Sequence, residues 1–180
     1  MATKLATSSM KSDLTLKTFV TFRVTGDSLV PDEVTRLLKV RPTYVRLKGQ
    51  PYSTGRSENI IPSTNMWFFS TEDLVASQNL FDHVRMALFV TGLLGPGGVD
   101  QLNSNDINNM TVRRLLALKA LMLQQSAKAT MTFFWHGASG SIFPKIPDAL
   151  FDLLKLIEVD VDIDFDKDEE TKSGRKHKAA

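Results

Sequence analysis

The sequence predicts a single α+β domain in which helices cover one face of a β-sheet. Residues 159–165 alternate between apolar and acidic side chains, as a half-buried strand does, whereas residues 150–157 carry apolar side chains at helical spacing. A strand–helix–strand pattern occurs twice, with antiparallel strand material between the copies, as in a split βαβ layout. We therefore expect a ferredoxin-like sandwich, varied by an internal duplication and by inserted helices.

The expected duplication rests on two pairs of similar segments. Residues 132–137 resemble residues 21–26, and residues 147–156 resemble residues 31–40, with five of the ten positions identical in the second pair. The apolar positions of the two copies also agree in phase. The copies therefore predict the same order of strand, turn and helix.

Carrying the alignment forward predicts a strand at residues 44–48. It aligns Val45 and Leu47 with the inward residues of the last strand. Arg46 and Lys48 then point outward, where the later copy has aspartates. We expect an open sheet face whose two halves carry opposite charge.

The remaining elements follow from spacing and from turn residues. Pro31 suits the first position of a short helix, because its missing N–H would have no partner there. The expected strands lie at residues 19–25, 44–48, 66–70, 130–136 and 159–165, and further helices at residues 74–91, 111–125 and 150–157.

The predicted helix at residues 111–125 carries a wider apolar stripe than one sheet contact requires. It is either sandwiched inside the domain or offers a face to a partner, including a second copy of the chain. We favour the internal position, because burial is the commoner fate of such stripes.

The expected domain spans residues 18–166 and is large enough to bury one core. We expect residues 1–17 to form a flexible N-terminal extension and residues 167–180 a disordered charged tail. Residues 100–109 form an Asn-rich linker, which the family resemblance described below marks as an insertion.

The composition limits the functional classes. The absence of cysteine excludes disulfides and thiolate metal sites, and fits a reducing cytoplasm. No window approaches the roughly 18 apolar residues that a membrane helix needs, so we expect a cytoplasmic protein without membrane contact. The net charge of +2 is too small to imply a nucleic-acid partner by itself.

A spaced set of landmarks carries a family resemblance. The landmarks are residues 22–31, Leu37-Leu38, Arg41-Pro42-Thr43, Lys48-Gly49, Trp67, Phe134-Trp135 and residues 150–165. Together they resemble the bacterial "domain of unknown function 4279" family over residues 18–166. The resemblance implies a small cytoplasmic bacterial or phage-borne protein without established enzymatic activity, and an immunity or inhibitor role against a protein is one function it suggests.

The acidic last strand is the first candidate site. Asp160, Asp162 and Asp164 alternate with apolar residues, and His136 ends the neighbouring strand. An EF-hand is excluded, because Phe165 stands where that loop needs glycine. The alternatives are a metal-dependent enzyme and a charged strand that resists edge-to-edge aggregation. We expect no cofactor and no bound metal.

A basic stretch with interleaved aromatic residues is the second candidate site. It could bind a nucleic acid or a phosphorylated ligand; alternatively, Arg46 and Lys48 pair with the acidic strand or keep the surface hydrated. The candidate binding residues here are Arg23, Arg41, Tyr44, Arg46, Lys48, Tyr52 and Arg56.

No complete catalytic constellation is visible in the sequence. Ser139 lies in a glycine-rich turn, but the second glycine follows one residue too early for a nucleophile elbow. Our leading prediction is therefore a non-catalytic protein that binds another protein through the open sheet face.

Overall fold

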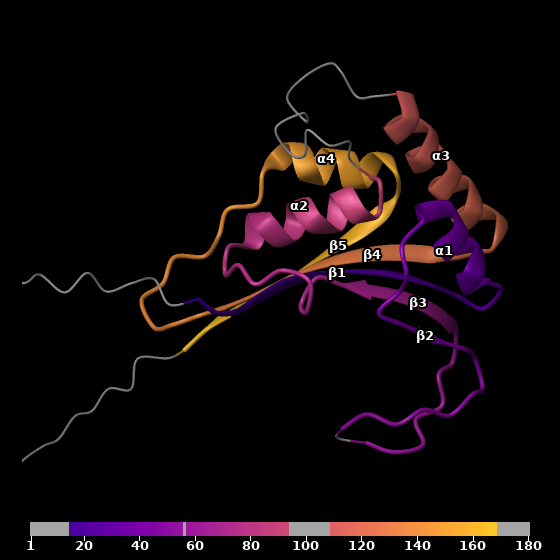
Figure 1. Cartoon of the computed structure of the whole chain (residues 1–180), viewed down its shortest axis with the longest axis horizontal. Coiled ribbons are helices and arrows are strands. Elements are labelled where there is room, and N and C mark those ends of the chain that lie inside the picture. The colour runs from indigo at the N-terminus through magenta and orange to yellow at the C-terminus, as the bar shows by residue number, and fades with distance from the viewer. Residues whose placement is uncertain (1–14, 56, 94–108, 169–180) are drawn as a thin grey trace, which may run out of the picture.

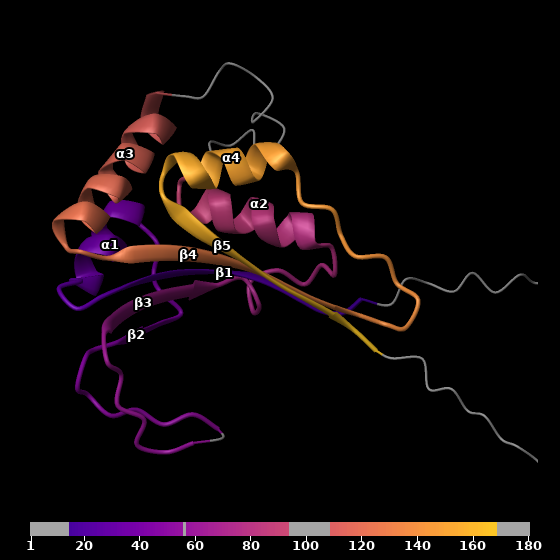
Figure 2. The ribbon, with the colours of Figure 1, turned by 180° about the vertical axis from the view of Figure 1, so that it is seen from behind.

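The computed structural model describes residues 15–55, 57–93 and 109–168, and these residues form a five-stranded sheet with helices on one side (Figure 1). The reverse view shows the same layering, with the other side of the sheet free of helices (Figure 2). The predicted α+β class is confirmed. In chain order, the elements are β1 (Thr15–Gly26), α1 (Pro31–Leu38), β2 (Tyr44–Arg46), β3 (Asn65–Ser70), α2 (Leu80–Val90), α3 (Asn109–Gln124), β4 (Lys128–Gly137), α4 (Asp148–Leu156) and β5 (Val159–Lys167).

The strand order is β2-β3-β1-β4-β5. β3 is antiparallel to both β2 and β1, so β2 and β1 run in the same direction with β3 between them. β4 is antiparallel to β1, and β5 is parallel to β4. β2 and β5 therefore form the two opposite edges of the sheet.

The core lies between the sheet and the helices. Successive side chains of a strand point to opposite faces, and alternate residues of the three central strands are buried. Trp67 of β3 is fully buried, and its indole Nε1 donates a hydrogen bond to the Thr35 hydroxyl of α1 at 3.0 Å. The inward residues of these strands are Val20, Phe22, Val24, Trp67, Phe69, Ala129, Met131, Phe133 and Trp135.

Helix α2 is shorter than the predicted helix at residues 74–91. Asn79 caps it, because its side-chain oxygen accepts a hydrogen bond from the Phe81 N–H at 3.0 Å. The buried His83 lies 2.7 Å from the Thr71 hydroxyl through Nδ1 and 2.8 Å from the Ser77 carbonyl through Nε2. Both ring nitrogens of His83 are thus used in packing α2 against the chain that precedes it.

Helix α3 divides its wide apolar stripe between the core and the surface. Leu115, Leu118 and Met122 are buried, whereas Leu116 and Leu123 are 60% and 82% exposed. We expected the apolar stripe of α3 to be buried inside the domain, and only one side of the stripe is buried. A self-association surface on α3 stays a prediction.

Several predicted boundaries differ from the structure. β1 begins at Thr15, inside the expected flexible N-terminal extension, and β5 ends at Lys167, the first residue of the expected tail. β2 ends at Arg46 instead of Lys48, because the Lys48 N–H bonds to the side chain of Asn65 instead of to a backbone carbonyl of β3. Residues 1–14, the tail beyond residue 168 and nearly all of the Asn-rich segment lie outside the described residues.

Among the helices that the structure describes, none combines the length and the apolar character that crossing a bilayer requires.

Candidate functional site

The side of the sheet without helices, here called the open face, displays the strand residues that do not enter the core. The register of the strands places Arg46, Met66, Thr25 and Lys128 in one row across this face. The remaining residues of the open face are Tyr44, Phe68, Ser70, Lys17, Phe19, Thr21, Arg23, Thr130, Thr132, Phe134, His136, Asp160, Asp162, Asp164 and Asp166.

Arg46 contacts two tyrosine rings at the β2 edge of the open face. Its guanidinium carbon is 3.5 Å from the ring centroid of Tyr52 and 4.5 Å from that of Tyr44. The Tyr44 ring also stacks on Phe68, with centroids 4.4 Å apart and an interplanar angle of 12°. We call Tyr44, Arg46, Tyr52 and Phe68 the arginine clamp. Cation–π contacts of this kind fix the orientation of a guanidinium group.

The environment of the clamp changes the acidity of one phenol. Burial raises the pKa of Tyr44 above its ordinary value of 10.0, and the neighbouring Tyr52 acts in the same direction. The positive charges of Arg46 and Arg23 oppose this rise in pKa. Tyr44 therefore remains neutral at physiological pH.

Tyr52 reaches Arg46 because residues 47–64 fold back on the open-face side of the sheet, next to β2 and β3 (Figures 1 and 2). We call these residues the arm; the structure describes all of them except residue 56. Tyr52 and Ile60 pair across the arm by two backbone hydrogen bonds of 3.0 and 2.9 Å. The arm is thus hairpin-like where it carries Tyr52.

Asn65 fastens the base of the arm. Its side-chain oxygen accepts a hydrogen bond from the Lys48 N–H at 2.7 Å. Its amide nitrogen donates to the carbonyl oxygens of Leu29 and Asp27, at 2.9 and 3.3 Å. One side chain at the start of β3 therefore joins the arm to the β1–α1 turn.

The basic residues differ in their pairing. Lys48 forms an ion pair with Asp27 at 3.1 Å. Within the part of the chain that the structure describes, Arg23, Arg41 and Arg46 have no carboxylate at ion-pair distance. The alternative in which Arg46 and Lys48 pair with the acidic strand is wrong, because β2 and β5 are opposite edges of the sheet. Arg56 lies outside the described residues.

The acidic residues line the other edge. Asp160, Asp162 and Asp164 are exposed on the outward positions of β5, as predicted. The catalytic alternative required His136 to lie next to Asp162 and Asp164. The ion-pair contacts of His136 are instead with Asp166 and Asp168. The imidazole of His136 lies 3.0 Å from the Asp168 carboxylate and 3.7 Å from that of Asp166, because the parallel register sets His136 beside Asp166. Among the described residues, no three histidine or acidic side chains are placed to share a metal ion.

Aromatic side chains in the middle of the open face escaped the sequence analysis. Phe19 of β1 stacks on Phe134 of β4, with centroids 4.5 Å apart, and Phe68 takes part in the clamp. The signal was the strand phase: once Trp67 and Phe69 point inward, Phe68 must point outward. The open face is therefore partly apolar between its charged edges.

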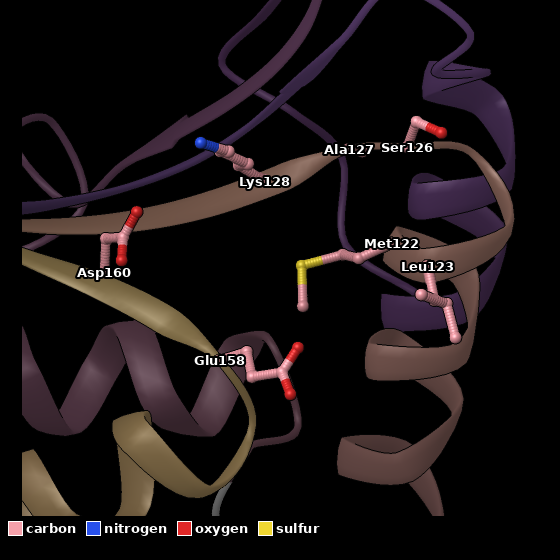
Figure 3. Close-up of a pocket in the computed structure, with 7 residues that line it drawn as sticks. All are labelled: Met122, Leu123, Ser126, Ala127, Lys128, Glu158 and Asp160. Carbon is pink, nitrogen blue, oxygen red and sulfur yellow. The ribbon is translucent and has the colours of Figure 1, made fainter.

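A hollow of about 480 Å³ lies apart from the clamp, beside the start of β4 and β5 (Figure 3). The side chains of Met122 and Glu158 point toward the space between α3 and the start of β5. Glu158 is already paired with Lys119 at 2.8 Å. The other residues that line the hollow are Leu123, Ser126, Ala127, Lys128 and Asp160. The lining is therefore mixed, with acidic, basic and apolar side chains.

Together these features describe an α+β protein with a charged, partly aromatic open face. The family model described as Domain of unknown function (DUF4279) matches residues 16–89. This match confirms the predicted family resemblance from β1 through most of α2, including the clamp and the arm. Residues 90–166, which include β5, lie beyond the match. No curated protein and no solved structure shows significant similarity to the chain.

Proposed function

We propose that this chain is a non-catalytic binding protein that recognises another protein through the open face. The observation that carries the proposal is the charge distribution of that face. Arg46 at the β2 edge and Arg23 on the central strand β1 lack an acidic partner among the described residues, and exposed aspartates follow β5 at the opposite edge. A surface with both signs of charge accelerates association with a complementary protein and excludes partners of the wrong polarity.

The stacked aromatic pairs support a protein partner. Phe19 and Phe134 supply apolar area in the centre of the face, where protein interfaces concentrate their affinity. The charged residues around them form a polar rim. This arrangement suits a folded protein surface better than a small substrate.

Nucleic-acid or phosphorylated-ligand binding is the second candidate, favoured by the unpaired arginines next to tyrosines. Two observations weaken it. The faces of Tyr44 and Phe68 are stacked on each other, which leaves fewer rings for unpaired bases. A phosphate backbone that crossed the face would also meet the aspartates of β5.

An immunity or inhibitor role in a bacterial cytoplasm is one specific form of the proposed function. The family resemblance suggests this role, and the lack of cysteine in the chain fits a reducing cytoplasm. A toxin or nuclease encoded by a neighbouring gene would be the first partner to test.

The test is a pull-down from native lysate with the wild-type chain and two charge-reversal variants. Arg46→Glu changes the open face, and Arg85→Glu changes an exposed position on α2, on the other side of the sheet. We expect the wild type and Arg85→Glu to recover the same stoichiometric protein, and Arg46→Glu to lose it. Recovery of no partner by the wild type, together with turnover of a substrate by the pure protein, would refute the proposal.

A titration with single-stranded oligonucleotides at two salt concentrations addresses the second candidate. Binding through phosphates weakens steeply as salt rises. Absence of binding at low salt would eliminate that candidate.

We also propose that the domain is a ferredoxin-like variant that arose by duplication. The first four strands support this, because β1-α1-β2-β3-α2-α3-β4 with sheet order β2-β3-β1-β4 has the connectivity of a split βαβ sandwich with one helix added before β4. β4-α4-β5 then repeats the strand–helix–strand order of β1-α1-β2.

A further inference from the structure

We propose that the arginine clamp is a receptor for a carboxylate group on an acidic segment of the partner protein. This inference rests on the proposed function and goes further, because it assigns the anchor residue and the chemistry that the partner must present. Arg46 is the group that binds, and Tyr44 and Tyr52 hold it in place.

The N–H donors of the Arg46 guanidinium are left for a ligand. The guanidinium carbon lies over the rings of Tyr52 and Tyr44, 3.5 and 4.5 Å from their centroids, and these contacts use the ring faces instead of a hydrogen-bond acceptor. The Arg46 side chain forms no hydrogen bond or ion pair with any described residue, so its guanidinium N–H donors have no acceptor there. A planar fork of donors matches the two oxygens of a carboxylate.

The clamp is organised before any ligand arrives. The backbone pairing of Tyr52 with Ile60 holds one ring, and the three hydrogen bonds of Asn65 hold the base of the arm. Tyr44 is held by β2 and by its stack on Phe68. An anchor that needs no rearrangement loses less conformational entropy on binding.

The charges around the clamp favour an anion. Arg23 is close enough to lower the pKa of Tyr44, and it has no acidic partner among the described residues. Asp27, at the base of the arm, is neutralised by Lys48. A carboxylate next to Arg46 would therefore meet two positive groups.

A carboxylate suits the whole face better than the phosphate of a nucleic acid does. An acidic protein segment can end at the clamp, and basic residues elsewhere on the same protein can then meet Asp162 and Asp164. A nucleic acid carries negative charge along its entire length and would place phosphates against those aspartates.

The experiment is an NMR titration of the full-length chain, following the Arg46 Nε–H and the ring protons of Tyr52. The probe is a capped pentapeptide of alternating glutamate and aspartate. We expect saturable shifts of both signals in the wild type and in Arg85→Lys, an exposed arginine on α2. We expect binding about tenfold weaker in Arg46→Lys, which keeps the charge and loses the fork. Tyr52→Leu should weaken binding by about threefold, because one cation–π contact is lost.

Each other outcome contradicts the inference. Equal binding by Arg46→Lys, with backbone spectra that show an intact fold, would mean that the fork is not used. Tighter binding of a single-stranded oligonucleotide than of the peptide at the same salt concentration would assign the clamp to phosphate. Absence of peptide binding would refute the clamp as a carboxylate receptor, whereas the pull-down would still decide whether the open face binds a protein.

Discussion

The two strand–helix–strand units of this protein follow one local pattern but end in different surfaces. In β4-α4-β5, the second strand joins its parallel neighbour directly and pairs with it from Val159 to Lys167. In β1-α1-β2, the antiparallel strand β3 separates the two parallel strands, and β2 pairs with β3 at three residues only. Both β2 and β5 are sheet edges, and Val45 and Ile163 on their helix-facing sides are 39% and 52% exposed.

The difference shows how strand length decides what an edge presents. The long β5 displays a row of aspartates at every second residue, a pattern that discourages pairing with another strand. The short β2 ends at Arg46. The arm therefore begins at residue 47 and folds back, which places the Tyr52 ring against Arg46. The arginine clamp therefore forms in the unit whose second strand is short.

The largest effect is expected from replacing Trp67, the buried residue through which β3 packs against α1 in the unit β1-α1-β2. We expect Trp67→Ala to lower the free energy of unfolding by about 3–5 kcal/mol, because it leaves a cavity and takes the indole donor away from Thr35. Urea denaturation measures the change. The control in the other unit is Ile163→Ala at the exposed edge, for which we expect a loss below about 1 kcal/mol. Similar losses for the two variants would contradict the comparison.

A smaller effect is expected at the base of the arm. Asn65→Ala removes one acceptor and two donated hydrogen bonds at a partly exposed site, so we expect a loss of stability of about 1–2 kcal/mol. The Lys48 amide, which loses its acceptor, should exchange its hydrogen faster. Asn65→Asp keeps the acceptor and should retain the protection of that amide. Unchanged exchange in Asn65→Ala would show that the side chain does not hold the arm.

The smallest effect concerns pH. Tyr44 and Tyr52 are the two tyrosines of the chain, so the phenolate absorbance of the wild type minus that of Tyr44→Phe isolates Tyr44. We expect its midpoint above pH 10.0, because burial raises the pKa of this phenol. The folded state then binds the proton more tightly than the unfolded state does, so the contribution of Tyr44 to stability is complete below pH 10 and is lost as pH rises through the folded pKa. A titration midpoint of Tyr44 at or below pH 10.0 would contradict the burial of its phenol.

Some of the site could be predicted from local pattern. Alternation along β5 identified the outward positions of Asp160, Asp162 and Asp164, and alignment of the two units gave the outward position of Arg46. These predictions succeeded because a strand repeats every two residues, so one inward residue fixes the face of its neighbours. The contacts of His136 could not be predicted in this way, because they depend on the register between β4 and β5.

The amino-acid sequence by itself determined the α+β class, the order of strands and helices, the family resemblance and the face on which each strand residue lies. These properties follow from short-range periodicity and from side-chain size. Only the tertiary structure decided that β2 and β5 become opposite edges and that Tyr52 meets Arg46. Those relations join residues from separate segments, and their geometry depends on how the whole sheet buries its inward side chains.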